Sequence, residues 1–242
     1  MYSFLSSVRY SECDTHARLS IPALVDYLQD CAIFHTESLG HGVDFIAKHP
    51  FAWYIAAWQI QVERRPGFAE NLQVSTWCHT MTTTMAGRSF LIQNDAGEAL
   101  VKADSLWFVF DKLRQRPIRV PEEERIYLTD DPRIDLPPTM RKLHVRGTGE
   151  PQTPIVVADE HLDTNHHVNN GQYVTMADHA IRHLEEDFEP YRLLVQYKLA
   201  ATLGDTIVPI VHEEQDGYSV DLSSPMGTSY AVVCMERRAG RP

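Results

Sequence analysis

Three side chains that can act together on a carbonyl group lie close together in the run Asp163-Thr164-Asn165-His166-His167. If this run is extended, side chains two positions apart point to the same side. Asp163, Asn165 and His167 would then lie on one side of the chain, and His166 on the other. A histidine, with an ordinary pKa of about 6.5, suits a general base near neutral pH. An amide can donate a hydrogen bond to a polarised oxygen. The combination predicts attack of water on a polarised carbonyl.

The residues that follow predict a helix that begins beside these side chains. Asn169 and Asn170 are good N-cap residues, and an amphipathic run from about 171 to 186 comes directly after them. Backbone N–H groups at a helix N-terminus bind negatively charged groups. We therefore expect an oxyanion site at Val168, Asn169 and Asn170. A capped helix after a polar loop, without chemistry, is the plainer interpretation of the same residues.

The pattern D-x-N-x-H-V-N-N, followed by the aromatic Tyr173, resembles the active-site signature of the acyl-ACP thioesterases. The opening run 9–14 and the run 29–31 also resemble that family, so the resemblance covers nearly the whole chain. It implies an α+β fold of the double hotdog type. It also implies that Asp163, Asn165 and His167 are catalytic, whereas His166 stands at a variable position.

The reaction implied by the resemblance is hydrolysis of the thioester that links a fatty acyl chain to acyl carrier protein (ACP) through its phosphopantetheine arm. His167 would be the general base, and free fatty acid would be released without a cofactor or a metal. Asp163 would orient the imidazole, share the water or attack the carbonyl itself, and the sequence does not choose among these roles. An acyl-CoA thioesterase of the same fold is the nearest alternative, and a hotdog lyase is a more distant one.

One position departs from the family pattern. The family has a further acidic or cysteine residue shortly before a Gly-Asp pair, and anchoring on Gly204-Asp205 places Ala200 and Ala201 there. Neither alanine can relay a proton. Three interpretations stay open: the three residues suffice, Glu12 or Asp14 substitutes, or the protein binds acyl chains or acyl-ACP without turnover.

The order of the elements predicts an internal duplication. Asp14-Thr15-His16-Ala17-Arg18-Leu19 precedes a helical run 21–39, as Asp163 to Val168, 149 residues later, precedes its own helix. Arg18 stands opposite His167 and cannot be a general base, so one site per chain is expected. Alternating runs follow each helix and predict strands at 53–64, 72–82, 89–94, 99–110, 193–199, 206–213, 218–223 and 229–237.

One helix followed by strands, twice, is the plan of two hotdog units, which we place at 1–111 and 154–242. Their unpaired sheet edges can join into one continuous sheet. The link, 112–153, is rich in proline and charge, with a short helix expected at about 122–127.

Binding surfaces are predicted mainly from residue type. Candidates for the acyl tunnel, which would otherwise be core residues, are Leu24, Leu28, Trp53, Ile55, Trp58 and Trp107. Candidates for docking of ACP are Lys112, Arg114, Arg116 and Arg119, with Arg64, Arg65 and Arg88 as a second basic cluster.

Composition bounds the remaining possibilities. The net charge of −11 argues against nucleic acid as a partner, and docking of ACP, which is also acidic, would need a local basic patch. The hydrophobic content of 43% excludes a disordered chain. Four scattered cysteines predict reduced thiols, and no run is long enough to span a bilayer. We expect a soluble cytoplasmic protein, either a monomer or a homodimer.

Overall fold

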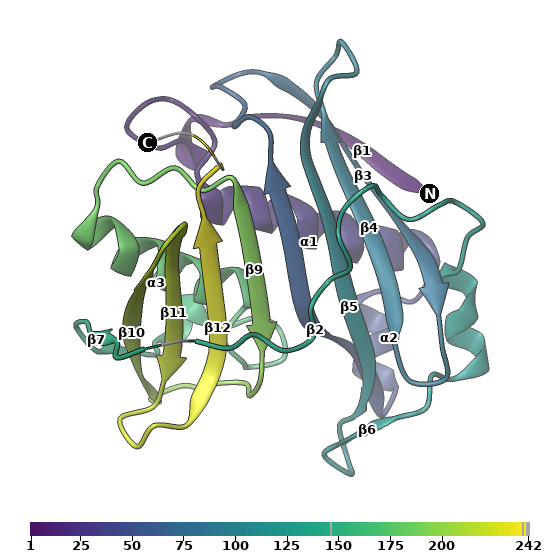
Figure 1. The fold of residues 1–242 in the computed structure, drawn as a ribbon. Coiled ribbons are helices and arrows are strands. Elements are labelled where there is room, and N and C mark those ends of the chain that lie inside the picture. The colour runs from purple at the N-terminus through teal and green to yellow at the C-terminus, as the bar shows by residue number, and fades with distance from the viewer. Residues whose placement is uncertain (146, 239, 241–242) are drawn as a thin grey trace. The chain divides into compact units, whose positions relative to one another are not determined.

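The computed structural model describes residues 1–145, 147–238 and 240 of the 242-residue chain. The chain divides into two compact units, Met1–Thr139 (unit 1) and Met140–Pro242 (unit 2), and the division falls inside the predicted link 112–153. The predicted ranges 112–153 and 154–242 also take in residues 146, 239, 241 and 242, which lie outside the described residues. Each unit contains an antiparallel sheet and one long helix (Figure 1).

Unit 1 is built on five long antiparallel strands. In the sheet they follow the order β1-β3-β4-β5-β2, and the short strand β6 (Arg116–Ile118) pairs with the end of β5. Their bounds are β1 Tyr2–Ser7, β2 Phe51–Val62, β3 Asn71–Met81, β4 Ala86–Gln93 and β5 Ala99–Asp111.

The helix α1 (Ile21–Ser38) covers β1 and β3 with an apolar face that includes Leu24, Leu28 and Cys31. Its start is set by Ser20, whose hydroxyl accepts the backbone N–H of Ala23 at 3.3 Å. A second helix, α2 (Val43–Lys48), follows. It is not predicted from the sequence, because six residues are too few to show helical periodicity.

Unit 2 repeats this plan with four long strands, β9 to β12, and two short ones, β7 and β8. Its sheet has the order β9-β12-β11-β10-β7, in which β7 pairs with the middle of β10 and β8 pairs with its first two residues. The helix α3 (Asn170–Leu184) packs on β10, β11 and β12. The strand bounds are β7 Glu150–Pro151, β8 Ile155–Val156, β9 Arg192–Tyr197, β10 Thr206–Glu214, β11 Gly217–Ser223 and β12 Ser229–Glu236.

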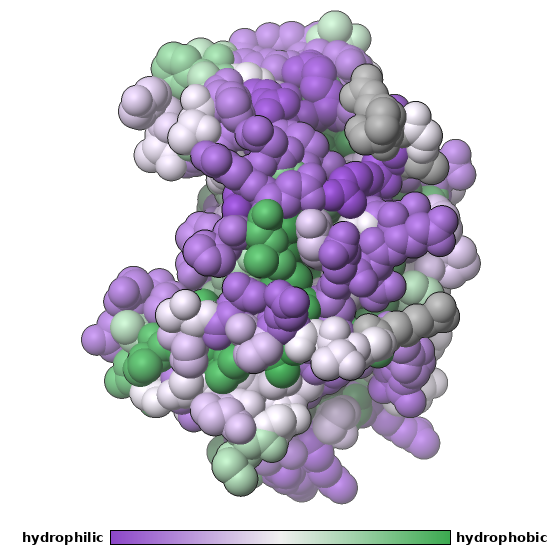
Figure 2. Space-filling view, turned by 60° about the vertical axis from the view of Figure 1, so that its left-hand side comes forward, coloured by the Kyte–Doolittle hydropathy of each residue, from purple (hydrophilic) through white to green (hydrophobic). Residues whose placement is uncertain are grey.

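The eight strands and two long helices predicted from periodicity all occur, with ends shifted by three residues or fewer. The short helix expected at 122–127 is the 3-10 helix η2 (Glu122–Tyr127). Pairing of the two sheets into one stays a prediction. Figure 2 shows one face of the molecule, on which hydrophilic side chains predominate and apolar ones gather in small areas.

Residues after η2 are held on unit 1 by a buried carboxylate. Asp104, on β5, is 2% exposed and accepts hydrogen bonds from Arg133 Nε at 3.0 Å and Thr139 Oγ1 at 2.7 Å. It also contacts His79 Nε2 at 2.9 Å and accepts from Ser89 Oγ at 3.2 Å. Burial alone would raise the pKa of Asp104, but the hydrogen bonds from His79 and Thr139 and the charge of Arg133 outweigh it and lower this pKa.

Replacing Asp104 with asparagine is expected to lower the free energy of unfolding by about 3 kcal/mol, because Arg133 loses its counter-charge and the buried hydrogen-bond network around position 104 loses its charged acceptor. A lowered folded-state pKa contributes stability above the unfolded-state pKa of about 3.9, and this contribution is lost as the pH falls through the folded-state value. Urea unfolding between neutral pH and the onset of acid unfolding should therefore show a shallower pH dependence in Asp104→Asn. The exposed Asp130→Asn is the control, and equal pH dependence in all three proteins would contradict the assignment.

Candidate active site

The loop that carries the predicted catalytic residues is closed on itself by Asp163. The Asp163 N–H donates to the His167 carbonyl at 2.8 Å, and the His166 N–H donates to the Asp163 carbonyl at 3.0 Å. Asp163 Oδ1 accepts the N–H groups of Asn165 at 2.8 Å and His167 at 3.3 Å. His166 has a φ of 60° in the left-handed region.

The extended backbone predicted for this loop is therefore wrong. An aspartate side chain accepts backbone N–H groups two or more residues ahead, and this local bond replaces the extended conformation. The structure still brings Asp163 and Asn165 together, with Asn165 Nδ2 at 3.4 Å from Asp163 Oδ2. Asn165 and His166 are exposed, whereas Asp163 and His167 are half-buried.

The helix that follows begins as predicted, with Asn169 as its N-cap. The Asn169 side chain accepts the N–H of Gly171 at 2.9 Å. The N–H groups of Val168 and Asn169 donate to the carbonyls of Ala201 and His161, both at 2.9 Å. Of the three expected oxyanion donors, Asn170 alone has a backbone N–H without a hydrogen bond among the described residues.

Ala200 and Ala201 lie beside this loop. The Ala201 carbonyl accepts from Val168, and the Ala201 N–H donates to the hydroxyl of Tyr173 at 2.9 Å. Tyr173 is 2% exposed, and burial raises its pKa to about 12. Ala201 is fully buried and Ala200 is exposed. Where the family has a polar side chain, this chain therefore has Ala201, which holds the loop through its backbone N–H and carbonyl.

Unit 1 contains the same loop in a second copy. The Asp14 N–H donates to the Arg18 carbonyl at 2.8 Å, and Asp14 Oδ1 accepts the N–H groups of His16 and Arg18 at 2.9 and 3.0 Å. Ala17 has a φ of 55°, in the place of His166. The shared hydrogen-bond pattern supports the duplication predicted from the order of elements.

The two copies differ at one contact. Arg65 Nη1 lies 2.6 Å from Asp14 Oδ2 and 3.1 Å from the carbonyl of Leu19. The carbonyl after Arg65, that of Pro66, accepts the N–H of Leu19, just as the carbonyl after Ala200 accepts that of Val168. Arg65 and Ala200 are thus equivalent positions, and unit 2 has a methyl group where unit 1 has a guanidinium.

This contact sets the electrostatics of the unit 1 copy. Burial would raise the pKa of Asp14, but the N–H of Arg18 and the guanidinium of Arg65 lower it. Glu12 is also engaged, with Arg9 Nη1 and the Tyr27 hydroxyl at 2.8 and 2.9 Å. These contacts disfavour the interpretation that Glu12 or Asp14 replaces the missing acid.

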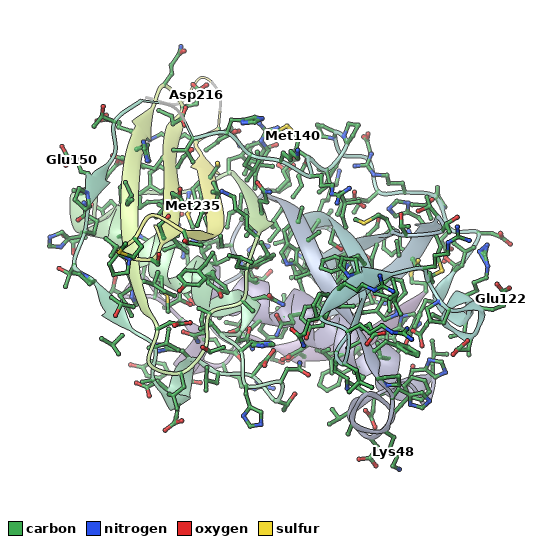
Figure 3. All side chains as sticks on the ribbon, turned by 90° about the horizontal axis from the view of Figure 1, so that it is seen from below. Lys48, Glu122, Met140, Glu150, Asp216 and Met235 are labelled. Atoms are coloured by element: carbon green, nitrogen blue, oxygen red, sulfur yellow. The ribbon has the colours of Figure 1, made fainter. Side chains whose placement is uncertain are left out.

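Unit 1 carries an apolar pocket, and two of the six predicted tunnel residues, Trp53 and Trp107, line it. Leu24, Leu28, Ile55 and Trp58 are instead buried in the core and are absent from the lining. The sequence missed the lining residues of α2 and η2, among them Phe45, Glu124 and Tyr127, because no motif links these segments. Figure 3 labels Lys48 at the end of α2 and Glu122 at the start of η2.

The predicted docking residues follow β5. Arg114, Arg116 and Arg119 are exposed, whereas the Lys112 ammonium donates to the carbonyl of Ile46 at 2.5 Å. The second predicted basic cluster is wrong, since Arg65 and Arg88 are only 6% and 7% exposed. Both arginines lie within or beside strands, where a charged residue is normally taken to face water.

Comparison with known proteins decides the family. Residues 2–127 match the model of the acyl-ACP thioesterase N-terminal domain, and residues 150–233 match that of the C-terminal domain. The chain belongs to the acyl-ACP thioesterase family.

Similar proteins agree with this assignment. A chloroplastic palmitoyl-acyl carrier protein thioesterase of Gossypium hirsutum is 29% identical over 181 residues, which cover 69% of this chain and 44% of that protein. A chloroplastic dodecanoyl-[acyl-carrier-protein] hydrolase of Cinnamomum camphora is 26% identical over 184 residues, or 69% and 47% of the two chains. The chain thus spans less than half the length of these two relatives.

Solved structures of acyl-ACP thioesterases confirm the fold. One from Bacteroides thetaiotaomicron has a TM-score of 0.85 at 19% identity, covering 97% of this chain and 96% of that chain. The 12:0-ACP thioesterase from Umbellularia californica also has a TM-score of 0.85, at 20% identity, covering 98% and 96%. The predicted α+β double hotdog class is therefore correct. Among the described residues, no helix is both long enough and apolar enough to cross a membrane.

Replacing Arg65 with alanine is expected to lower the free energy of unfolding by about 3 kcal/mol, because the partly buried Asp14 carboxylate loses its cation. The neighbouring Arg64 is the matched control. Its side chain is 42% exposed while it pairs with Glu70 and Glu98, so Arg64→Ala should cost about 1 kcal/mol or less. Denaturant unfolding measures both, and equal losses would contradict a special role of the Arg65–Asp14 pair.

Proposed function

We propose that this chain hydrolyses the thioester of fatty acyl-ACP and releases a free fatty acid. The observation that carries the proposal is the loop 163–169, which follows the signature of the family and places a carboxylate, an amide and an imidazole directly before a helix N-terminus. The names of the relatives, which include palmitoyl- and dodecanoyl-ACP hydrolases, support an acyl-ACP substrate.

In the proposed reaction, His167 removes a proton from a water molecule as its oxygen attacks the thioester carbonyl. The negative charge that develops on the carbonyl oxygen is stabilised by the Asn165 amide and by the backbone N–H of Asn170 at the helix start, which has no hydrogen bond within the described part of the chain. When the carbon–sulfur bond breaks, the protonated imidazole returns its proton to the leaving thiolate. The products are the fatty acid and the free thiol of phosphopantetheine.

Asp163 is proposed to act mainly by holding the loop. Its Oδ1 is occupied by the N–H groups of Asn165 and His167, and this fixes the backbone that carries the amide and the base. Oδ2 is 3.4 Å from the Asn165 amide and has no arginine like Arg65 beside it at position 200. The two backbone contacts at Oδ1 favour an orienting role for this carboxylate.

A second candidate function is binding of acyl chains or acyl-ACP without turnover. The alanines at 200 and 201, at the place where the family has an acidic or cysteine residue, are the observation that favours it. An acyl-CoA thioesterase of the same fold is the enzyme alternative. A cytoplasmic location and a monomeric or dimeric state stay predictions.

Replacing His167 with alanine is expected to slow thiol release from long-chain acyl-ACP by roughly 100-fold or more, because the general base is lost. His166→Ala is the matched control from the adjacent position, and it should stay within about threefold of wild type, since its side chain is exposed and carries no assigned step. Thiol release is followed with a chromogenic thiol reagent. An equal loss of rate in the two variants would show that His167 is not the general base. A wild type that binds acyl-ACP but releases no thiol would support the binding protein instead.

Reversing the charge of Arg114, Arg116 and Arg119 to glutamate together is expected to raise KM for acyl-ACP by about tenfold at low salt, because a local basic patch steers an acidic partner. The effect should shrink as salt screens it, and KM for acyl-CoA should change little. Reversal at the exposed Arg141 and Lys142 of unit 2 is the control. An equal rise of KM for acyl-CoA, or no rise of KM for acyl-ACP, would disprove docking of ACP at these three arginines.

A further inference from the structure

The lining of the unit 1 pocket includes a buried arginine that has no carboxylate partner among the residues the structure describes. Arg88, on β4, lines the pocket and is 7% exposed. Within the described residues, its hydrogen bonds come from Nη1 alone, to His35 Nδ1 at 2.9 Å and Thr76 Oγ1 at 3.3 Å. A buried charge normally has a counter-charge, and keeping one without it is costly. The remaining donors of this guanidinium therefore call for an acceptor.

The side chains around Arg88 do not neutralise it. Burial and the adjacent guanidinium lower the pKa of His35 to about 4, so His35 is a neutral acceptor at pH 7. The guanidinium carbon lies 5.6 Å from the centre of the Tyr127 ring, a cation–π distance that leaves its edge donors unused.

A second donor belongs to the same pocket. Tyr127, on η2, is 3% exposed, and its hydroxyl makes no hydrogen bond within the described residues. Burial raises the pKa of this phenol, so its proton stays available for donation. Buried hydroxyl groups of tyrosine normally have a partner. Arg88 and Tyr127 are therefore two buried residues with unused donors that line one largely apolar pocket.

A carboxylate in the same lining limits the charge of any ligand. Glu124 is 1% exposed, with Oε1 3.0 Å from His41 Nδ1 and Oε2 2.5 Å from Trp53 Nε1. Because Glu124 lines the same pocket, its negative charge would repel an anionic ligand there. A neutral oxygen fits this setting better than a carboxylate.

We propose that this pocket selects acyl chains that carry a neutral oxygen, a hydroxyl or oxo group, which accepts hydrogen bonds from Arg88 and Tyr127. This inference rests on the proposed function, because it treats the pocket as the acyl-binding part of a thioesterase. The apolar lining, including Ile33, Phe45 and Met81, holds the hydrocarbon. An unsubstituted chain would leave both donors unpaired, and a site built around polar groups rejects such a ligand.

The test compares binding with turnover in the full chain. Isothermal titration measures Kd for an unsubstituted saturated fatty acid, its hydroxy derivatives at carbon three, in mid-chain and at the terminal carbon, the corresponding oxo acids, and the dicarboxylic acid. The wild type is expected to bind at least one hydroxy or oxo isomer about tenfold or more tightly than the unsubstituted acid. Tightest binding of the dicarboxylic acid, or no preference above twofold, would overturn the proposal.

Variants separate recognition from structure. Tyr127→Phe keeps the ring and removes the donor, and Arg88→Met keeps an unbranched side chain without charge, so both should reduce the preference at least fivefold. Arg125→Met, in the same 3-10 helix with its side chain 47% exposed, should leave the preference unchanged. If Arg88→Met fails to fold, Tyr127→Phe decides the outcome. A preference that persists in Tyr127→Phe would also sink the proposal.

Thiol release from the matching acyl-ACPs distinguishes this inference from the proposed function. Tight binding of the hydroxy acids without turnover of any acyl-ACP would contradict the proposed hydrolysis and still support recognition of the chain oxygen. Turnover of all acyl-ACPs with no preference for the substituted chains would support the hydrolysis and contradict recognition of the chain oxygen.

Discussion

The structure of the candidate active site depends on one carboxylate that accepts two backbone N–H groups. Asp163 closes the loop 163–167, and through it the backbone positions of Asn165 and His167 are determined before either side chain meets a substrate. The loop is also tied by backbone bonds from Val168 to Ala201 and from Asn169 to His161. Under the proposed function this matters, because groups that react with a substrate must be held in the correct geometry before it binds.

The same arrangement occurs in unit 1 with a different outcome. There Asp14 closes the loop, but Arg65 occupies its second oxygen, and Arg18 stands where His167 stands in unit 2. A duplicated element has thus kept its backbone and diverged in the side chains that decide chemistry. Unit 1 instead has an apolar pocket, so under the proposed function one unit performs the reaction and the other binds the acyl chain.

Much of the fold could be predicted from the sequence, because burial imposes a period on strands and helices that the residues show directly. The strands and both long helices followed from that period, and the D-x-N-x-H-V-N-N run located the loop and its helix N-cap. The conformation of the loop did not follow, because a bond from Asp163 to backbone N–H groups has no periodic signal. The pocket was largely missed, because α1, α2, η2 and four strands far apart in the chain line it. Arg65 and Arg88 were misplaced on the surface because burial of an arginine depends on partners that only tertiary structure reveals.

The missing arginine at position 200 has a consequence for local motion. The two loops share their backbone hydrogen bonds, and among the described residues only the loop carboxylate of unit 1, Asp14, also pairs with an arginine, the buried Arg65. Local opening of a segment costs less free energy when fewer side-chain contacts oppose it. Amide protons of the unit 2 loop should therefore exchange with solvent faster than their counterparts in unit 1. Under the proposed function, the more easily opened of the two loops would then be the one that carries the reacting groups.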